Sequence, residues 1–110
     1  MDYRIKFAGS FEQELKKLAR KYRSLTEEAA ELVAALKISP QTGTSLGRNC
    51  YKIRLKIASK GGGKSGGARV ITCVLAVRET VYLLSIYDKA EQDTISDKRL
   101  AELLATLPIS

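Results

Sequence analysis

The sequence predicts an α+β fold, in which one domain over residues 1–110 contains an antiparallel sheet packed on one side by helices. Two observations carry this prediction. The 110 residues are about one domain in length, and 45% of them are hydrophobic against 28% charged, as is typical of a globular protein. The hydrophobic spacing also changes along the chain, from a helical period in the first third to strand-like alternation and short apolar runs later.

The first third is predicted to contain a strand and a helical hairpin. Apolar and basic residues alternate from Tyr3 to Phe7, which is typical of a half-buried strand. Ser10 and Ser24 are the expected N-caps of two amphipathic helices, and Glu27 completes a capping-box pattern with Ser24. The expected elements are a strand over 2–8, helices over 10–22 and 24–37, and a loop over 40–49.

The second part of the chain is predicted to be an antiparallel meander followed by a short C-terminal helix. A glycine-rich segment and a turn separate three strand-like segments, and the first strand is expected to join the same sheet. Ser96 is the expected cap of the last helix, which Pro108 ends. The expected strands are 51–57, 68–77 and 81–87, the turn is 78–80, and the last helix begins near Ser96.

The positive charge of the chain is concentrated in one segment. The sequence has 19 Lys and Arg against 12 Asp and Glu, a net charge of +7. The 22 residues from Arg48 to Arg69 contain seven of these cations and no carboxylate, so the remainder is balanced at 12 of each sign. This segregation predicts an anionic partner.

Composition also excludes several classes of protein. There is no apolar run of the roughly 20 residues that a membrane span requires, and the N-terminus lacks the pattern of a secretory signal, so a cytoplasmic location is expected. Cys50 and Cys73 lie in strand-like segments without metal-ligand spacing and are expected to be reduced core thiols. The chain has no histidine. No metal and no cofactor is expected.

The segment 51–57 has one apolar and one basic face. Alternate residues of a strand lie about 6.5–7 Å apart on the same side, so Lys52, Arg54 and Lys56 form a row of cations near the spacing of successive phosphates. An ordinary solvated sheet face is the alternative, but such a face normally mixes charges of both signs. We interpret the row as a polyanion-binding surface, to which Arg48 is added.

A glycine-rich segment covers residues 60–67, and residues 58–65 fit a loose phosphate-loop pattern. A true phosphate loop leads into a helix, whereas this segment leads into the strand-like residues after Arg69, so a nucleotidase is disfavoured. Two interpretations stay open: a flexible hairpin connection, and a cationic flap in which Lys60 and Lys64 contact a nucleic-acid backbone.

Tyr87 and Lys89 follow the last expected strand. Tyr87 is a core aromatic residue, a base-stacking platform or a proton donor, and Lys89 is either a solvated charge or part of a site. If strand order brings Arg69 beside the basic row, Arg54, Arg69 and Lys89 converge on one phosphate. A register shift of one residue would remove that convergence.

Two stretches, 51–71 (YKIRLKIASKGGGKSGGARVI) and 82–91 (YLLSIYDKAE), resemble the HigB branch of the RelE/ParE superfamily of bacterial toxins. The order of strand, helical hairpin and meander also resembles the RelE-like fold. The resemblance implies the toxin of a type II toxin–antitoxin system, a ribosome-dependent mRNA endonuclease that inhibits translation. It also implies an acidic antitoxin partner, together with the ribosome and mRNA.

On this resemblance the basic catalytic pair falls on Lys52 and Arg54, the phosphate-stabilising arginine on Arg69, and the last cation on Lys89. Two positions depart from the family pattern. RelE has a tyrosine where this chain has Ile95, so Tyr87 would have to serve instead, and Gly62 replaces the central lysine of the loop.

Cleavage through a 2′-hydroxyl needs a base, stabilisation of the phosphorane charge and a proton for the leaving oxygen. Lys52 and Tyr87 are candidates for the proton transfers, and the arginines for charge stabilisation. Two alternatives stay open: a ParE-like toxin that inhibits DNA gyrase, which lacks the catalytic basic cluster, and a non-catalytic RNA-binding module.

Overall fold

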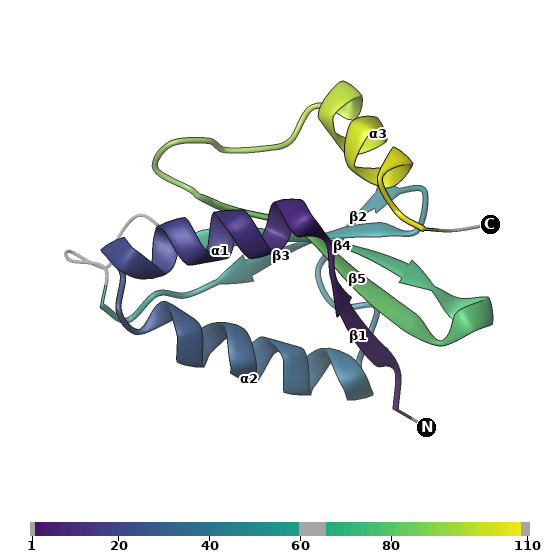
Figure 1. Cartoon of the computed structure of the whole chain (residues 1–110), viewed down its shortest axis with the longest axis horizontal. Helices are drawn as coiled ribbons and strands as arrows, with labels where there is room; N and C mark the ends of the chain where they lie inside the picture. The colour runs from purple at the N-terminus through teal and green to yellow at the C-terminus, as the bar shows by residue number, and fades with distance from the viewer. Residues whose placement is uncertain (1, 60–65, 109–110) are drawn as a thin grey trace.

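The computed structural model describes residues 2–59 and 66–108 and places five strands in one sheet with three α-helices (Figure 1). The sheet order is β1-β5-β4-β3-β2. The elements are β1 (Arg4–Phe7), α1 (Gly9–Lys21), α2 (Leu25–Ile38), β2 (Thr44–Gly47), β3 (Cys50–Leu55), β4 (Ala68–Leu75), a 3₁₀ turn (Ala76–Arg78), β5 (Thr80–Asp88) and α3 (Asp97–Ala105).

The predicted meander is confirmed, with β3, β4 and β5 paired antiparallel in sequence order. The prediction of a wholly antiparallel sheet is wrong, because β1 pairs parallel with β5 and the sheet is therefore mixed. Parallel strands need a long crossover connection. The helical hairpin of α1 and α2 begins this crossover over one face of the sheet, so β1 pairs with β5 and not with the next strand in the sequence.

The segment predicted as a loop over 40–49 contains the edge strand β2. Its sequence, Thr-Ser-Leu-Gly, has little apolar alternation, so its own residues give no strand signal. The pairing with β3 depends on the tight turn between them, in which Arg48 and Asn49 have φ angles of 55° and 64°. Two successive left-handed residues form the kind of two-residue turn whose twist matches an antiparallel hairpin.

Ser24 is the N-cap residue of α2, as predicted, but neither Ser10 nor Ser24 makes the expected capping bond. Helix α1 begins at Gly9, and the Ser10 hydroxyl instead donates to the Leu84 carbonyl oxygen of β5 at 2.6 Å. The Ser24 hydroxyl makes no capping bond to the backbone of α2 but donates to Glu28 Oε1 at 3.0 Å, so the capping box with Glu27 is absent. The cap predicted at Ser96 is confirmed, since its hydroxyl accepts from the Arg99 backbone N–H.

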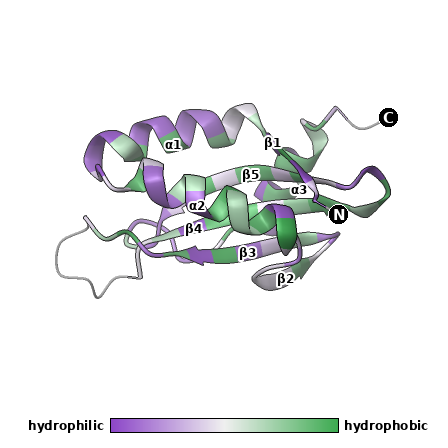
Figure 2. Ribbon diagram, turned by 90° about the horizontal axis from the view of Figure 1, so that it is seen from below, coloured by the Kyte–Doolittle hydropathy of each residue, from purple (hydrophilic) through white to green (hydrophobic). Residues whose placement is uncertain are grey.

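Helices cover both faces of the sheet, not one as predicted. Helices α1 and α2 bury a first core on one face, which includes Phe11, Leu25 and Leu83. Helix α3 buries a second core on the opposite face, which includes Leu100 and Leu103. Strands β4 and β5 lie between the two cores and are apolar along most of their length, whereas α1 is largely hydrophilic (Figure 2).

Cys50 and Cys73 face each other across β3 and β4 in the second core. Both are free and buried, as predicted. A hydrogen bond with Cys73, together with burial, raises the pKa of the Cys50 thiol, so Cys50 stays protonated at neutral pH. Among the described residues no helix is long and apolar enough to cross a lipid bilayer.

Candidate nucleic-acid interface

The alternation predicted for the basic strand is present in β3 and just beyond it. Ile53, Leu55 and Ile57 are buried in the first core. Lys52, Arg54 and Lys56 therefore point to the opposite face of the sheet. On this face α3 covers the end near Cys50, and we call the rest the open face. It carries the half-buried Lys52 and the exposed Arg54, and at its border with the second core the buried Arg69 and Tyr87.

Strand register brings three of the predicted site residues into one row across the open face. Arg54 pairs with Arg69, and Arg69 pairs with Tyr87. The Val74 N–H donates to the Asn49 carbonyl at 2.8 Å, which marks that position as a hydrogen-bonded pair. Hydrogen-bonded and non-hydrogen-bonded pairs alternate along an antiparallel ladder, so Arg54 and Arg69, five positions further along, form a non-hydrogen-bonded pair. Opposing side chains lie closest in a pair of this type. Two cations directly opposite each other destabilise a sheet unless an anion relieves them.

Arg69 is the most enclosed cation of this row, with only 5% of its surface exposed. Its Nη1 donates to the carbonyl oxygens of Gly66 at 2.8 Å and Ala68 at 3.2 Å. These bonds hold the guanidinium against the start of β4. An arginine fixed in this way presents its planar fork in one orientation, which suits recognition of phosphate oxygens.

Lys89 and Arg69 both lie next to Gly66. The Lys89 backbone N–H donates to the Gly67 carbonyl at 3.0 Å, which pins the residue after β5 to the chain entering β4. A Cβ atom built on Gly66 would lie 3.4 Å from Arg69 Nη2 and 3.6 Å from Lys89 Cδ, so both side chains border this glycine. Lys89 Nζ forms an exposed ion pair with Asp93 at 3.4 Å. Such a pair is weak and can exchange for a phosphate.

Tyr87 is 7% exposed, and its hydroxyl is buried without a hydrogen-bond partner among the described residues. Burial raises the pKa of Tyr87, and the positive charge of Arg69 partly opposes this effect. The phenol is therefore protonated at neutral pH. A buried hydroxyl without a partner is costly, so this group is suited to donate to a ligand that enters beside Arg69.

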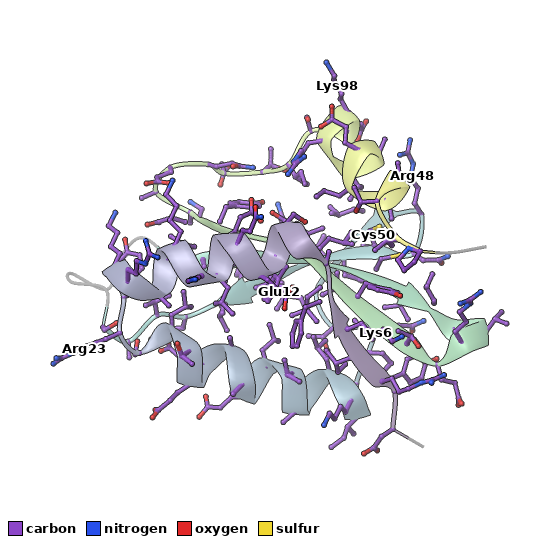
Figure 3. All side chains as sticks on the ribbon, viewed as in Figure 1. Lys6, Glu12, Arg23, Arg48, Cys50 and Lys98 are labelled. Atoms are coloured by element: carbon purple, nitrogen blue, oxygen red, sulfur yellow. The ribbon has the colours of Figure 1, made fainter. Side chains whose placement is uncertain are left out.

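Other predicted site residues lie apart from this row. Arg48 occupies the β2–β3 turn, six residues before Arg54 and therefore about 20 Å away along the strand direction. Figure 3 shows Arg48 near α3, at the opposite end of the long axis from Arg23. Lys60 and Lys64 lie outside the described residues. Ile95, at the position of the family tyrosine, packs against the second core.

A second group of cations lies on α1 and just after its end, and sequence reasoning missed it. Five cations and no carboxylate occur between Glu14 and Glu27, and all five are exposed. Within the described residues none of them forms an ion pair closer than 4.0 Å. The sequence outside residues 48–69 has equal numbers of cations and carboxylates, so its total charge gives no sign of this cluster. Net charge summed over a short sliding window would have found it. We call it the α1 patch: Lys16, Lys17, Arg20, Lys21 and Arg23.

The α1 patch adjoins the end of β5. A pocket of about 280 Å³ lies between them, lined by Lys17 and Lys21 on one side and by Tyr87 and Asp88 on the other. A separate apolar pocket of about 510 Å³ lies on the other flank of α1, where Phe7 and Phe11 line it together with Lys16 and Arg20 of the α1 patch. No cluster of three metal-binding side chains occurs within residues 2–59 and 66–108.

Comparison with known proteins matches residues 11–107 to the family described as the RelE toxin of the RelE/RelB toxin–antitoxin system. The isolated Escherichia coli RelE toxin is 19% identical over 96% of this chain and 99% of that one, with a TM-score of 0.61. A free arginine double mutant of the same toxin gives 21% identity over 96% and 94%, with a TM-score of 0.62. The RelBE2 toxin–antitoxin complex from Mycobacterium tuberculosis gives 18% over 82% and 94%, with a TM-score of 0.61.

At these identities the structural likeness establishes the RelE-like fold, and the family match covers nearly the whole chain. The chain therefore belongs to the RelE family, the toxins of RelE/RelB toxin–antitoxin systems.

Proposed function

We propose that this RelE-family toxin is a ribosome-dependent endoribonuclease of the HigB-like branch that cleaves mRNA and stops translation. The observation that carries the proposal is the row of Arg54, Arg69 and Tyr87 across the open face, with Lys89 bordering Arg69. This arrangement combines two arginines with a protonated hydroxyl, the groups that phosphodiester cleavage without a metal needs.

The proposed reaction begins with attack of a substrate 2′-hydroxyl on the adjacent phosphorus. Arg54 and Arg69 stabilise the charge that develops on the nonbridging oxygens. The buried Tyr87 hydroxyl donates a proton to the leaving 5′-oxygen, which its raised pKa allows at neutral pH. Lys52 lies about 7 Å from Arg54 along the same strand face, and only the neutral amine form of its side chain would accept the proton of the 2′-hydroxyl. The ribosome supplies the position of the mRNA.

Primer extension on mRNA bound to purified ribosomes tests this proposal. We expect cleavage within the A-site codon in the presence of ribosomes and none on naked mRNA. Inhibition of DNA supercoiling by gyrase without mRNA cleavage would favour the ParE-like alternative. Ribosome binding without cleavage would favour a non-catalytic RNA-binding module. Either result would overturn the nuclease proposal.

Replacing Tyr87 by phenylalanine is expected to lower the cleavage rate by about 10²-fold, the usual scale for loss of a general acid. The ring packing in the second core is retained, and a buried hydroxyl without a partner is removed, so the free energy of unfolding should not fall. Single-turnover cleavage and urea unfolding measure the two effects. Equal cleavage by Tyr82→Phe and Tyr87→Phe would exclude the proton-donor role.

The α1 patch is proposed to contact RNA backbone. Changing Lys16, Lys17 and Arg20 to alanine should weaken ribosome binding and reduce the dependence of log K on log salt by about 2, or somewhat under one unit per phosphate contact. Binding titrations at several salt concentrations measure this slope. The matched control changes the exposed Arg4, Lys37 and Arg78, far from the patch, and should leave the slope unchanged.

We also propose an acidic antitoxin that covers the open face and docks on the apolar pocket beside α1. Phe7 is 44% exposed and stacks on Phe11 with ring centroids 5.6 Å apart, which leaves an aromatic surface for a partner helix. Copurification with an acidic protein encoded beside this gene is expected, with affinity that falls as salt rises. Phe7→Asp should weaken this complex while ribosome binding persists, and an unchanged complex would exclude this pocket.

A further inference from the structure

A buried carboxylate lies directly behind the candidate site. Asp88 is the last residue of β5 and is 1% exposed. Its Oδ2 accepts a hydrogen bond from the Tyr22 hydroxyl at 2.6 Å, and its Oδ1 accepts one from the Ala90 backbone N–H at 2.9 Å. Asp88 thus joins the corner of the helical hairpin to the segment that follows β5.

The turn that carries Lys89 is built on Asp88. Besides the side-chain bond to Ala90, the Asp88 carbonyl oxygen accepts from the backbone N–H groups of Glu91 at 3.0 Å and Gln92 at 3.1 Å. Lys89 lies within the turn that these hydrogen bonds close, and its own backbone N–H donates to the Gly67 carbonyl. The position of Lys89 therefore depends on a turn in which Asp88 accepts the hydrogen bonds from the three residues that follow Lys89.

Tyr22 fixes the other oxygen of that carboxylate. It lies where α1 ends, is 8% exposed, and its N–H still bonds to the Leu18 carbonyl. Lys21 Nζ lies 5.3 Å from the centre of its ring. A short bond between a hydroxyl and a carboxylate is among the stronger hydrogen bonds in proteins, so it transmits the position of the hairpin to Asp88.

We propose that Tyr22 and Asp88 are positioning residues, which act through Lys89 to hold this cation beside Arg69 during RNA cleavage. The inference rests on the proposed function, and neither residue needs to touch the substrate. A displacement of about 1 Å in a catalytic group can lower a rate by about 10²-fold, so a buried bond on the far side of the sheet can control the reaction.

A double-mutant cycle separates positioning from a general effect on the fold. Tyr22→Phe should lower the single-turnover cleavage rate about 10-fold on saturating ribosomes, with ribosome affinity unchanged. In a Lys89→Ala background the same change should have almost no further effect, because the residue through which it acts is absent. An equal factor in both backgrounds would overturn the proposal.

Conservative variants of Asp88 provide a second test. Asp88→Asn can keep both contacts, since its amide oxygen accepts from Ala90 and its amide nitrogen donates to the Tyr22 oxygen. It should retain most of the cleavage rate, whereas Asp88→Ala should lose at least as much as Tyr22→Phe. Tyr3→Phe, which changes a partly buried tyrosine at the edge of the first core, is the matched control and should cleave like the wild type.

Amide hydrogen exchange in the free toxin gives a readout that needs no RNA. Tyr22→Phe should speed exchange at residues 89–92 more than in β4, while Tyr3→Phe should not. If the wild type fails to cleave on ribosomes, the proposed function fails and exchange alone decides whether the pair holds this turn. Unchanged exchange at 89–92 would overturn the positioning role even if the wild type cleaves.

Discussion

Replacing Arg69 by alanine is expected to lower ribosome-dependent mRNA cleavage by about 10²–10³-fold, the scale for removing one preorganised group from a transition-state charge. Arg69 is the central cation of the row, between Arg54 and Tyr87, and its guanidinium is held by the carbonyls of Gly66 and Ala68. Because the site is formed before RNA binds, the loss should appear mainly in the rate of the chemical step.

The effect is measured by single-turnover primer extension on saturating ribosomes. Arg69→Lys keeps the charge but loses the planar fork, so its rate should lie between those of the wild type and Arg69→Ala. The exposed Arg78, in the turn at the other end of the β4–β5 hairpin, offers a control, and Arg78→Ala should cleave normally. Equal cleavage by Arg69→Ala and the wild type, with both folded in urea titrations, would contradict the proposed mechanism.

Gly67→Ala is expected to reduce the free energy of unfolding by about 3 kcal/mol or more, which places it among the most damaging single changes. Gly67 has a φ angle of 66°, and an added Cβ would overlap the Leu55 carbonyl oxygen and lie 2.9 Å from the Ile57 backbone nitrogen. Both contacts are main-chain atoms of the neighbouring segment, so no side-chain rotation relieves them. Urea denaturation measures the change.

Gly47→Ala separates the steric effect from backbone strain. Gly47 also has a positive φ, 81°, but a Cβ there would have no neighbour within 4 Å. Its alanine variant should lose only the cost of a left-handed residue, about 1–2 kcal/mol. Equal losses for the two variants would show that the close approach of β4 to the end of β3 carries little energy.

The meander could be predicted because its signals are local. The alternation of residues 51–57 and the two later apolar runs each depend on residues close in sequence. Strand β2 could not, because its pairing comes from the backbone of the Arg48–Asn49 turn rather than from apolar residues. The capping bonds expected of Ser10 and Ser24 are absent because both hydroxyl groups bond to distant partners. Ser10 donates to Leu84 of β5, and the Ser24 oxygen accepts from the Ser59 backbone N–H, so both partners depend on tertiary packing.

The sequence indicated which residues form the candidate site, but not how their side chains are arranged in space. Basic residues in one segment identified Arg54 and Arg69, and the register then places them opposite each other. The contribution of Tyr22 is invisible in the sequence, because 66 residues separate it from Asp88. Arg48 belongs to the same basic segment, yet a strand carries it away from the row. In an extended strand, residues that are close in sequence can lie far apart in space.

The helical hairpin is electrically asymmetric. Helix α1 has four cations against two carboxylates, with Arg23 just after it, whereas α2 has three carboxylates against the single Lys37. Two adjacent helices of opposite sign give the molecule a dipole, and a dipole experiences a torque near a polyanion. An approaching toxin would therefore be turned before contact, with α2 directed away from the RNA. Such preorientation raises the fraction of productive collisions, and added salt should reduce it.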